Sequence, residues 1–169
     1  DGVIRKNDFY TNTVIAQVSS RVKTLSISPD GQRLAGGNED GHIMLWDLAN
    51  GNQEKMLHRI ENTPISSIEF SNDGKFLAFG DQTGNVTLWN LDSSTKEKTF
   101  TGHESDVTDL EFNKDDGLLA STSRDGTARL WIMADYNELP IELDDHSKGQ
   151  EAERWVWSVS FNPDGQSLV

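Results

Sequence analysis

The sequence predicts an all-β fold made of repeated four-stranded antiparallel units, and two observations carry this prediction. A segment of the form Asp-Gly-x-x-x-Leu-Trp recurs, with Thr-Gly in its second copy, so that tryptophans stand at Trp46, Trp89 and Trp131, 43 and 42 residues apart. A second pattern, an apolar strand followed by a tight turn, lies upstream of each tryptophan. A period in the low forties that carries several short strands is typical of stacked modules rather than of one continuous core.

Each unit begins with an alternating strand and a turn. The second copy covers residues 65–70 and continues with Ser-Asn-Asp-Gly, and equivalent strands begin at Val22, Val107 and Val156. Alternation of apolar and polar residues indicates a half-buried strand. Glycine in the turn adopts the positive φ that tight hairpins require. The turn of the third copy, residues 113–117, places its glycine one position later.

Three further strands complete the unit. In the second copy, the second strand covers residues 76–80, the third ends in Leu-Trp, and a weaker fourth covers residues 96–101. Alanine stands eleven residues before each tryptophan, at Ala35, Ala78 and Ala120. Four-stranded antiparallel sheets that repeat around an axis form a β-propeller. We expect the three repeat tryptophans to be buried between neighbouring sheets.

The pattern resembles the WD-repeat (Trp-Asp repeat) family of β-propellers over nearly the whole chain. Trp46-Asp47 is the dipeptide that gives the family its name, and Gly102-His103 resembles its Gly-His pair. Trp89-Asn90 and Trp131-Ile132 depart from the dipeptide at its second position, which is loosely held in such repeats. The resemblance implies a β-propeller of four-stranded antiparallel blades that acts by binding other molecules.

The resemblance also implies an internal stretch of a larger ring, because rings in this family usually have seven or eight blades. A self-assembling half-ring and a closed four-bladed ring are the less favoured alternatives. Residues 1–169 then form a single segment of about four repeats. We place a partial blade at 1–20, repeats at 21–61, 62–103 and 104–145, and a partial repeat at 146–169.

Composition and charge exclude several classes of function. The formal net charge of −13 makes the chain acidic, which argues against nucleic-acid binding and against docking on an anionic membrane. No stretch approaches the roughly 20 apolar residues that a membrane-spanning helix needs. The absence of cysteine rules out disulfides and thiolate metal sites. We expect a cytoplasmic location and no cofactor or metal, with Asp144-Asp145-His146 as a solvated acidic loop.

Ser121, His103 and Asp125 suggest either a serine-nucleophile triad or a structural network. In the resembling family, a histidine, a serine or threonine, an aspartate and the third-strand tryptophan form a hydrogen-bonded tetrad. The matching residues here are His103, Ser121, Asp125 and Trp131, with Ser123 a less favoured alternative to Ser121. A hydrolase would also need an oxyanion hole, and the chain has no Gly-x-Ser-x-Gly segment. We therefore expect a structural tetrad and no enzymatic activity.

The tetrad is expected in the third repeat alone. The other two repeats carry different residues at the matching positions: Val18 and Gly36 in the first, and Glu61, Phe79 and Thr83 in the second.

The favoured function is a protein-interaction scaffold or sensor module within a larger multidomain protein. A lectin-type, ligand-binding propeller is the alternative, and the Ser121/His103/Asp125 hydrolase is a weaker one. A lectin-type propeller needs the same polar and aromatic residues in every blade, whereas the loops of this chain differ between blades.

The binding surface is expected where the loops before the first strands meet the loops between the second and third strands. Trp155, directly before the last first strand, stands where the family often has a partner-facing residue, whereas Trp157 is expected to pack. The acidic segment 135–153 would favour a partner with a basic surface. Apolar blade faces at the two ends are expected to allow self-association. The predicted binding residues are Arg21, Glu39, Gln82, Arg124, Asp144, Asp145, Arg154 and Trp155.

Overall fold

The computed structural model describes residues 3–7, 12–17, 20–48, 53–136, 139–143 and 155–169. Within these ranges the chain forms strands and turns, with no helix. No helix long and apolar enough to cross a membrane therefore exists in the described part of the chain.

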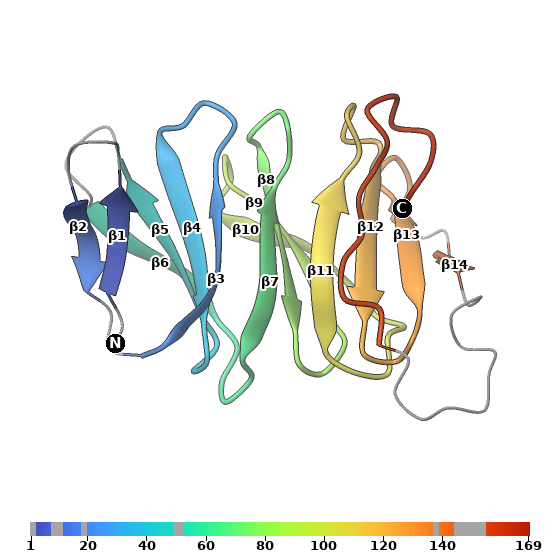
Figure 1. Cartoon of the computed structure of the whole chain (residues 1–169), viewed down its shortest axis with the longest axis horizontal. Helices are drawn as coiled ribbons and strands as arrows, with labels where there is room; N and C mark the ends of the chain where they lie inside the picture. Colours follow the sequence, from blue (N-terminus) through green and yellow to red (C-terminus); the bar gives the residue numbers. More distant parts are fainter. Residues whose placement is uncertain (1–2, 8–11, 18–19, 49–52, 137–138, 144–154) are drawn as a thin grey trace.

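Three sheets contain four antiparallel strands each, joined in sequence order (Figure 1). The first sheet consists of β3 (Val22–Ile27), β4 (Arg33–Asn38), β5 (His42–Asp47) and β6 (Gln53–Arg59). The second consists of β7 (Ile65–Phe70), β8 (Phe76–Asp81), β9 (Val86–Asn90) and β10 (Thr95–Phe100). The third consists of β11 (Val107–Phe112), β12 (Leu118–Ser123), β13 (Ala128–Ile132) and β14 (Ile141–Leu143). A two-stranded sheet of β1 (Val3–Asn7) and β2 (Asn12–Gln17) precedes them. The predicted all-β fold of four-stranded antiparallel units is confirmed.

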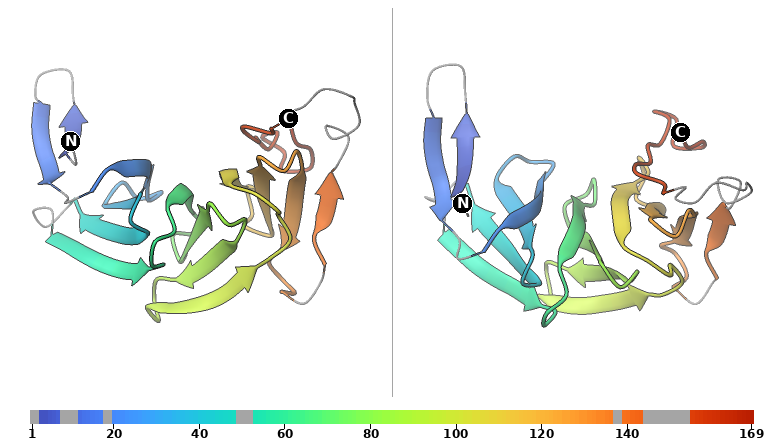
Figure 2. Two further views of the ribbon diagram at one scale, coloured as in Figure 1. Left: turned by 90° about the horizontal axis from the view of Figure 1, so that it is seen from below. Right: turned by 60° about the horizontal axis from the view of Figure 1, so that its bottom comes forward.

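The sheets stand side by side along an arc (Figure 2). Their first strands β3, β7 and β11 lie on the concave side, and the fourth strands β6 and β10 lie on the convex side. This arrangement buries both faces of the second sheet, so alternate residues of one strand pack against different neighbours. The arc is the geometry expected of consecutive propeller blades.

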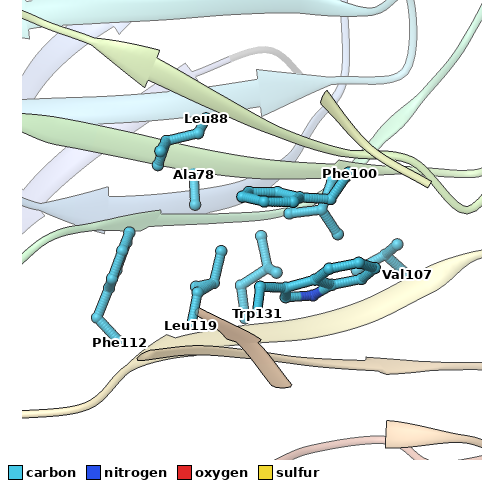
Figure 3. Close-up of a cluster of buried hydrophobic side chains, with 9 residues drawn as sticks. Ala78, Leu88, Phe100, Val107, Phe112, Leu119 and Trp131 are labelled. Atoms are coloured by element: carbon cyan, nitrogen blue, oxygen red, sulfur yellow. The ribbon is translucent and has the colours of Figure 1, made fainter. Parts of the chain in front are cut away.

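The cores lie between sheets, and the repeat tryptophans are central to them. Trp46, Trp89 and Trp131 are 0%, 8% and 3% exposed, which confirms their predicted burial. The core between the second and third sheets joins Ala78, Leu88 and Phe100 of one sheet to Val107, Leu110, Phe112, Leu119 and Trp131 of the next (Figure 3). Phe100 lies on Trp131 with ring centroids 5.0 Å apart, and His58 lies on Trp89 at 5.1 Å. The fourth strands β6 and β10 thus each supply a ring that lies on the tryptophan of the following sheet.

The turns between first and second strands contain the predicted residue with positive φ, but in one turn this residue is not glycine. Gly31, Gly74 and Gly165 have φ near 70°. In the third sheet Asp116, not Gly117, takes this position, with φ of 57°. Its carboxylate accepts the backbone N–H groups of Asn72 and Asp73 from the neighbouring sheet at 2.8 and 2.9 Å. These bonds offset the strain that a left-handed backbone imposes on a residue with a side chain.

The expectation that Trp157 packs is wrong, because its side chain is 59% exposed. Trp157 aligns with Lys23, Ser66 and Thr108, where the ladders of β3, β7 and β11 shift register. Lys23 is exposed at the equivalent place, whereas Ser66 and Thr108 are half-buried.

The fourth copy of the first strand, residues 156–161, forms no strand ladder within the described part of the chain. A bridge between Phe161 and Leu168 is its one strand-like pairing there. Side chains of β11 help to hold this segment in place. The Asp109 carboxylate accepts the Ser158 hydroxyl at 2.9 Å, and the Glu111 carboxylate accepts the Phe161 N–H at 2.7 Å.

Candidate functional site

The four residues expected to form a tetrad meet in the third sheet. The Trp131 indole N–H donates to Ser121 Oγ at 2.9 Å, and His103 Nε2 lies 2.7 Å from the same oxygen. Across the imidazole, His103 Nδ1 lies 2.9 Å from Asp125 Oδ2. His103 precedes β11 and Asp125 follows β12, so this network ties two loops to two strands.

We assign the imidazole proton of His103 to Nδ1. A carboxylate only accepts, so Nδ1–H donates to Asp125 and Nε2 accepts the Ser121 hydroxyl hydrogen. Burial lowers the pKa of His103 below its ordinary 6.5, although the Asp125 carboxylate acts in the opposite direction. The ring is therefore neutral near pH 7.

Thr127 is a fifth member that sequence reasoning missed. Its hydroxyl donates to Asp125 Oδ1 at 2.7 Å, and its backbone N–H donates to the same atom at 2.8 Å. Burial alone would raise the pKa of Asp125, but the bonds from Thr127 and from the Glu104 amide outweigh it and lower this pKa. The signal was present in Asp-Gly-Thr, since an aspartate often binds the backbone two residues on.

The geometry of the tetrad is that of a buried structural network. Ser121 is fully buried, and His103 is 6% exposed. A nucleophile must reach its substrate, whereas the Ser121 hydroxyl is enclosed by Trp131 and His103. Buried polar groups are stable when they are paired in this way.

The equivalent tryptophans have no such network within the described residues. Gly36 and Phe79 occupy the place of Ser121, each opposite the second apolar residue of its first strand. The indole N–H groups of Trp46 and Trp89 have no hydrogen-bond partner in the described part of the structure.

The loops before the first strands and the loops between the second and third strands lie at the same end of the sheets, which we call the loop face. One equivalent hydrogen bond in each sheet joins these loops, from a backbone N–H between the second and third strands to a carbonyl oxygen before the first strand. The donor and acceptor residues are Glu39 and Arg21 at 3.1 Å, Gln82 and Pro64 at 3.2 Å, and Arg124 and Asp106 at 3.0 Å. The predicted binding residues Arg21, Glu39, Gln82, Arg124 and Trp155 are all exposed. The predicted residues Asp144, Asp145 and Arg154 lie outside the described residues.

Two tryptophans and an arginine form the most distinctive cluster of the loop face. The Arg124 guanidinium lies 4.8 Å from the Trp155 ring centroid and 5.6 Å from that of Trp157. The two indoles meet edge to face at 5.2 Å. Sequence reasoning placed Arg124 and Trp155 on this surface but missed Trp157. Rigid aromatic rings beside a guanidinium have the composition of an interface hot spot.

An acidic residue lies beneath this cluster. Asp106 is 8% exposed, and its Oδ2 lies 3.5 Å from Arg124 Nε. Its Oδ1 is buried without a hydrogen-bond partner among the described residues. A buried carboxylate oxygen without a donor is costly, so this part of the loop face carries an uncompensated polar atom.

Comparison with known proteins follows the repeats of the structure. The model of the family "WD domain, G-beta repeat" matches residues 11–47, 54–90 and 94–131. These three matches contain all three buried tryptophans.

Similar curated proteins cover most of this chain. A Protein LST8 homolog of Drosophila pseudoobscura pseudoobscura is 29% identical over 87% of the chain and 33% of its own length. A chromatin assembly factor 1 subunit of Gallus gallus is 29% identical over 96% of the chain and 23% of its own length. The chain therefore spans about a third or less of these relatives.

A solved structure shares the fold. A chain in the crystal structure of a mitotic checkpoint complex superposes with a TM-score of 0.74 and 26% identity. The match covers 89% of this chain and 44% of the other.

Proposed function

This chain belongs to the WD domain, G-beta repeat family, and from that premise we propose that it is a protein-interaction scaffold that binds a partner through its loop face. Two of the similar proteins are parts of assemblies, a chromatin assembly factor and a mitotic checkpoint complex. Their lengths also support a role as a module, sensing or scaffolding, within a larger protein.

The cluster of Arg124, Trp155 and Trp157 is the observation that carries the proposal. Trp155 and Trp157 are 37% and 59% exposed, although aromatic side chains of this size are usually more deeply buried. The Arg124 guanidinium lies against both rings and restricts their rotation before a partner binds. Less side-chain entropy is then lost when a partner covers them.

The chemistry of the loop face supports a partner with a basic surface. The exposed rings of Trp155 and Trp157 offer apolar area to a partner. The acidic sequence around Asp144 and Asp145 adds long-range attraction for lysine and arginine. Such attraction mainly speeds the encounter between partners.

A binding experiment tests the proposal. Proteins that copurify with the full-length protein are identified, and each is then purified and titrated against the wild type and against Trp155→Ala by calorimetry. We expect Trp155→Ala to raise Kd by at least about tenfold, as for a hot-spot tryptophan, while the fold is unchanged. Lys114→Ala, in an exposed turn at the other end of the sheets, is the control. Equal affinity of wild type and Trp155→Ala for every partner would refute the loop-face assignment.

Association kinetics test the contribution of the acidic segment around Asp144 and Asp145 separately. Neutralising Asp144 and Asp145 together should slow association and flatten its dependence on salt concentration, with little change in dissociation. An unchanged association rate would remove the acidic segment from the proposal while leaving the tryptophan cluster in place.

A further inference from the structure

A cleft of about 440 Å³ opens between the second and third sheets, at the end opposite the loop face. We call this end, with its turns between first and second strands, the turn face. The cleft has apolar walls and an acidic rim. Its lining includes Phe76, Leu88, Phe112, Met133 and Tyr136, with Asp73, Asp115 and Asp116 at the turns.

The preceding pair of sheets shows what fills the equivalent space. There Arg33, at the start of β4, reaches across to the second sheet. Its guanidinium lies 5.6 Å from the Phe70 ring centroid, and its Nη2 donates to the Gly74 carbonyl oxygen at 2.8 Å. The chain thus fills the first of these two spaces with its own arginine.

The repeat register relates the two spaces residue by residue. Phe112 is the last residue of β11, as Phe70 is the last residue of β7. In the turns that follow these strands, Asp116 and Gly74 both have a positive φ. The residue equivalent to Arg33 is Phe76, at the start of β8. A phenylalanine carries no cation to the neighbouring turn, so the second space keeps the aromatic ring and the turn but lacks the arginine.

The acidic rim is stronger in the second space than in the first. Asp116 replaces Gly74 and adds a carboxylate, which clamps the Asn72–Asp73 turn. Asp115 is exposed, and its Oδ1 accepts a hydrogen bond from the backbone N–H of Gly117 at 3.1 Å. Asp73 is paired with Lys75 at 2.9 Å. A carboxylate at Asp115 is therefore available to a cation that enters the cleft.

We propose that this cleft binds an arginine side chain of a basic partner peptide. The methylene stem packs on Phe76 and Met133, and the guanidinium lies over Phe112 as that of Arg33 lies over Phe70. The guanidinium donates to the Asp115 carboxylate and to the turn carbonyls. This site is on the turn face and does not depend on the loop-face proposal.

A titration with small probes tests the site without a known partner. The probes are the blocked pentapeptide Gly-Gly-Arg-Gly-Gly and its citrulline and lysine counterparts. Backbone amide signals of Gly117 and Ala134 are followed by NMR in the full chain. We expect saturable shifts with the arginine peptide, none with the neutral citrulline peptide, and weaker binding of the lysine peptide, which lacks the planar fork. Equal shifts from arginine and citrulline, or equal affinity for arginine and lysine, would overturn the proposal.

A matched pair of variants distinguishes binding at this site from attraction of the peptide by the protein's net negative charge. Asp115→Asn removes the rim charge and keeps the acceptor for the Gly117 amide. Asp164→Asn is the control, because Asp164 Oδ1 accepts the Gln166 amide in the equivalent turn of the last repeat. We expect Asp115→Asn to weaken arginine-peptide binding about threefold or more and Asp164→Asn to leave it unchanged. Equal effects would show attraction by net charge alone and refute the site.

The repeat itself provides a second test. Phe76→Arg gives the second pair of sheets the residue that fills the first, so the new side chain should occupy the cleft and abolish peptide binding. Arg33→Ala should empty the space between the first two sheets and so open a second binding site there. Addition of the arginine peptide should then shift the backbone amide signal of Gly74. Retained peptide binding in a folded Phe76→Arg protein would contradict the inference.

Discussion

Gly80 on β8 lies directly against Val107 at the start of β11, and this contact fixes how closely the second and third sheets approach. A Cβ atom on Gly80 would lie 2.7 Å from Val107 Cβ, closer than real Cβ atoms approach one another. Gly37 and Ile65 stand in the same relationship between the first and second sheets, with 2.6 Å between the corresponding atoms. Glycine is thus required here for space, not for its backbone freedom.

Gly80→Ala is expected to destabilise the protein by about 1–3 kcal/mol, because Val107 is fully buried and cannot move aside without shifting a strand. Urea unfolding measures the effect. Gly117→Ala is the control, since its Cβ would meet only the flexible Asp115 carboxylate at 3.1 Å. Equal stability of Gly80→Ala and wild type would show that the sheets can separate freely.

His103→Ala is expected to cost about 1–3 kcal/mol, because it leaves Ser121 and Asp125 buried without their shared partner. Chemical unfolding measures this change, and Glu61→Ala, at the exposed equivalent position of the second repeat, serves as the control. Ester or peptide hydrolysis that disappeared in a folded Ser121→Ala variant would instead establish a catalytic role.

The pKa of His103 predicts a loss of stability in acid. Burial lowers the folded-state pKa below the ordinary 6.5, so the unfolded chain binds the proton more readily. Stability should therefore fall as the pH drops below about 6.5. Burial also lowers the pKa of His58, so wild type and His103→Ala are compared from pH 5 to 7.5 to isolate the tetrad. Parallel curves would show that His103 does not contribute.

Glu69 should act in the opposite sense. Burial raises the pKa of Glu69. The Ser26 hydroxyl, which donates to its carboxylate at 3.0 Å, lowers this pKa, but repulsion from Asp109 and Glu111 raises it further. The folded state then binds the proton more readily, so the ionised carboxylate destabilises the fold at neutral pH. Glu69→Gln, which keeps an acceptor for Ser26, should be more stable than wild type at pH 7.5, and this advantage should shrink in acid.

The exposed Glu61→Gln is the control for the Glu69 prediction. A stability gain equal to that of Glu69→Gln would assign the effect to net charge. A Glu69→Gln protein less stable than wild type at pH 7.5 would contradict the prediction.

Self-association is predicted to involve β3. Leu25 and Ile27 are 47% and 61% exposed, whereas the equivalent Ile68 and Phe70 are buried against the preceding sheet. Replacing both residues with Thr should reduce association at high concentration, as followed by sedimentation velocity. Met56→Thr, on the outer strand β6, is the control. A wild-type protein that stays monomeric at high concentration would exclude association through this face.

The repeat made most of the fold predictable, because strands, turns and tryptophans recur at fixed spacings. Ser121, His103 and Asp125 could be placed together only because the third repeat resembles the tetrad of the WD-repeat family. What the sequence did not predict depends on contacts between different sheets. Asp116 adopts a left-handed backbone, and its carboxylate binds the turn of the preceding sheet. Trp157 lies outside any strand ladder of the described residues, with its ring beside Trp155 and Arg124. Neither signal lies within a single repeat.

The unequal surroundings of the three repeat tryptophans make each sheet separately observable. The Trp131 indole N–H is bonded to Ser121, while those of Trp46 and Trp89 have no partner among the described residues. Hydrogen bonding slows the exchange of the Trp131 indole N–H with solvent, and the His58 ring 5.1 Å from Trp89 gives that indole surroundings different from those of Trp46, so the three copies provide three reporters. An experimenter can thus watch the sheets open one at a time and ask whether neighbouring repeats unfold together or in succession.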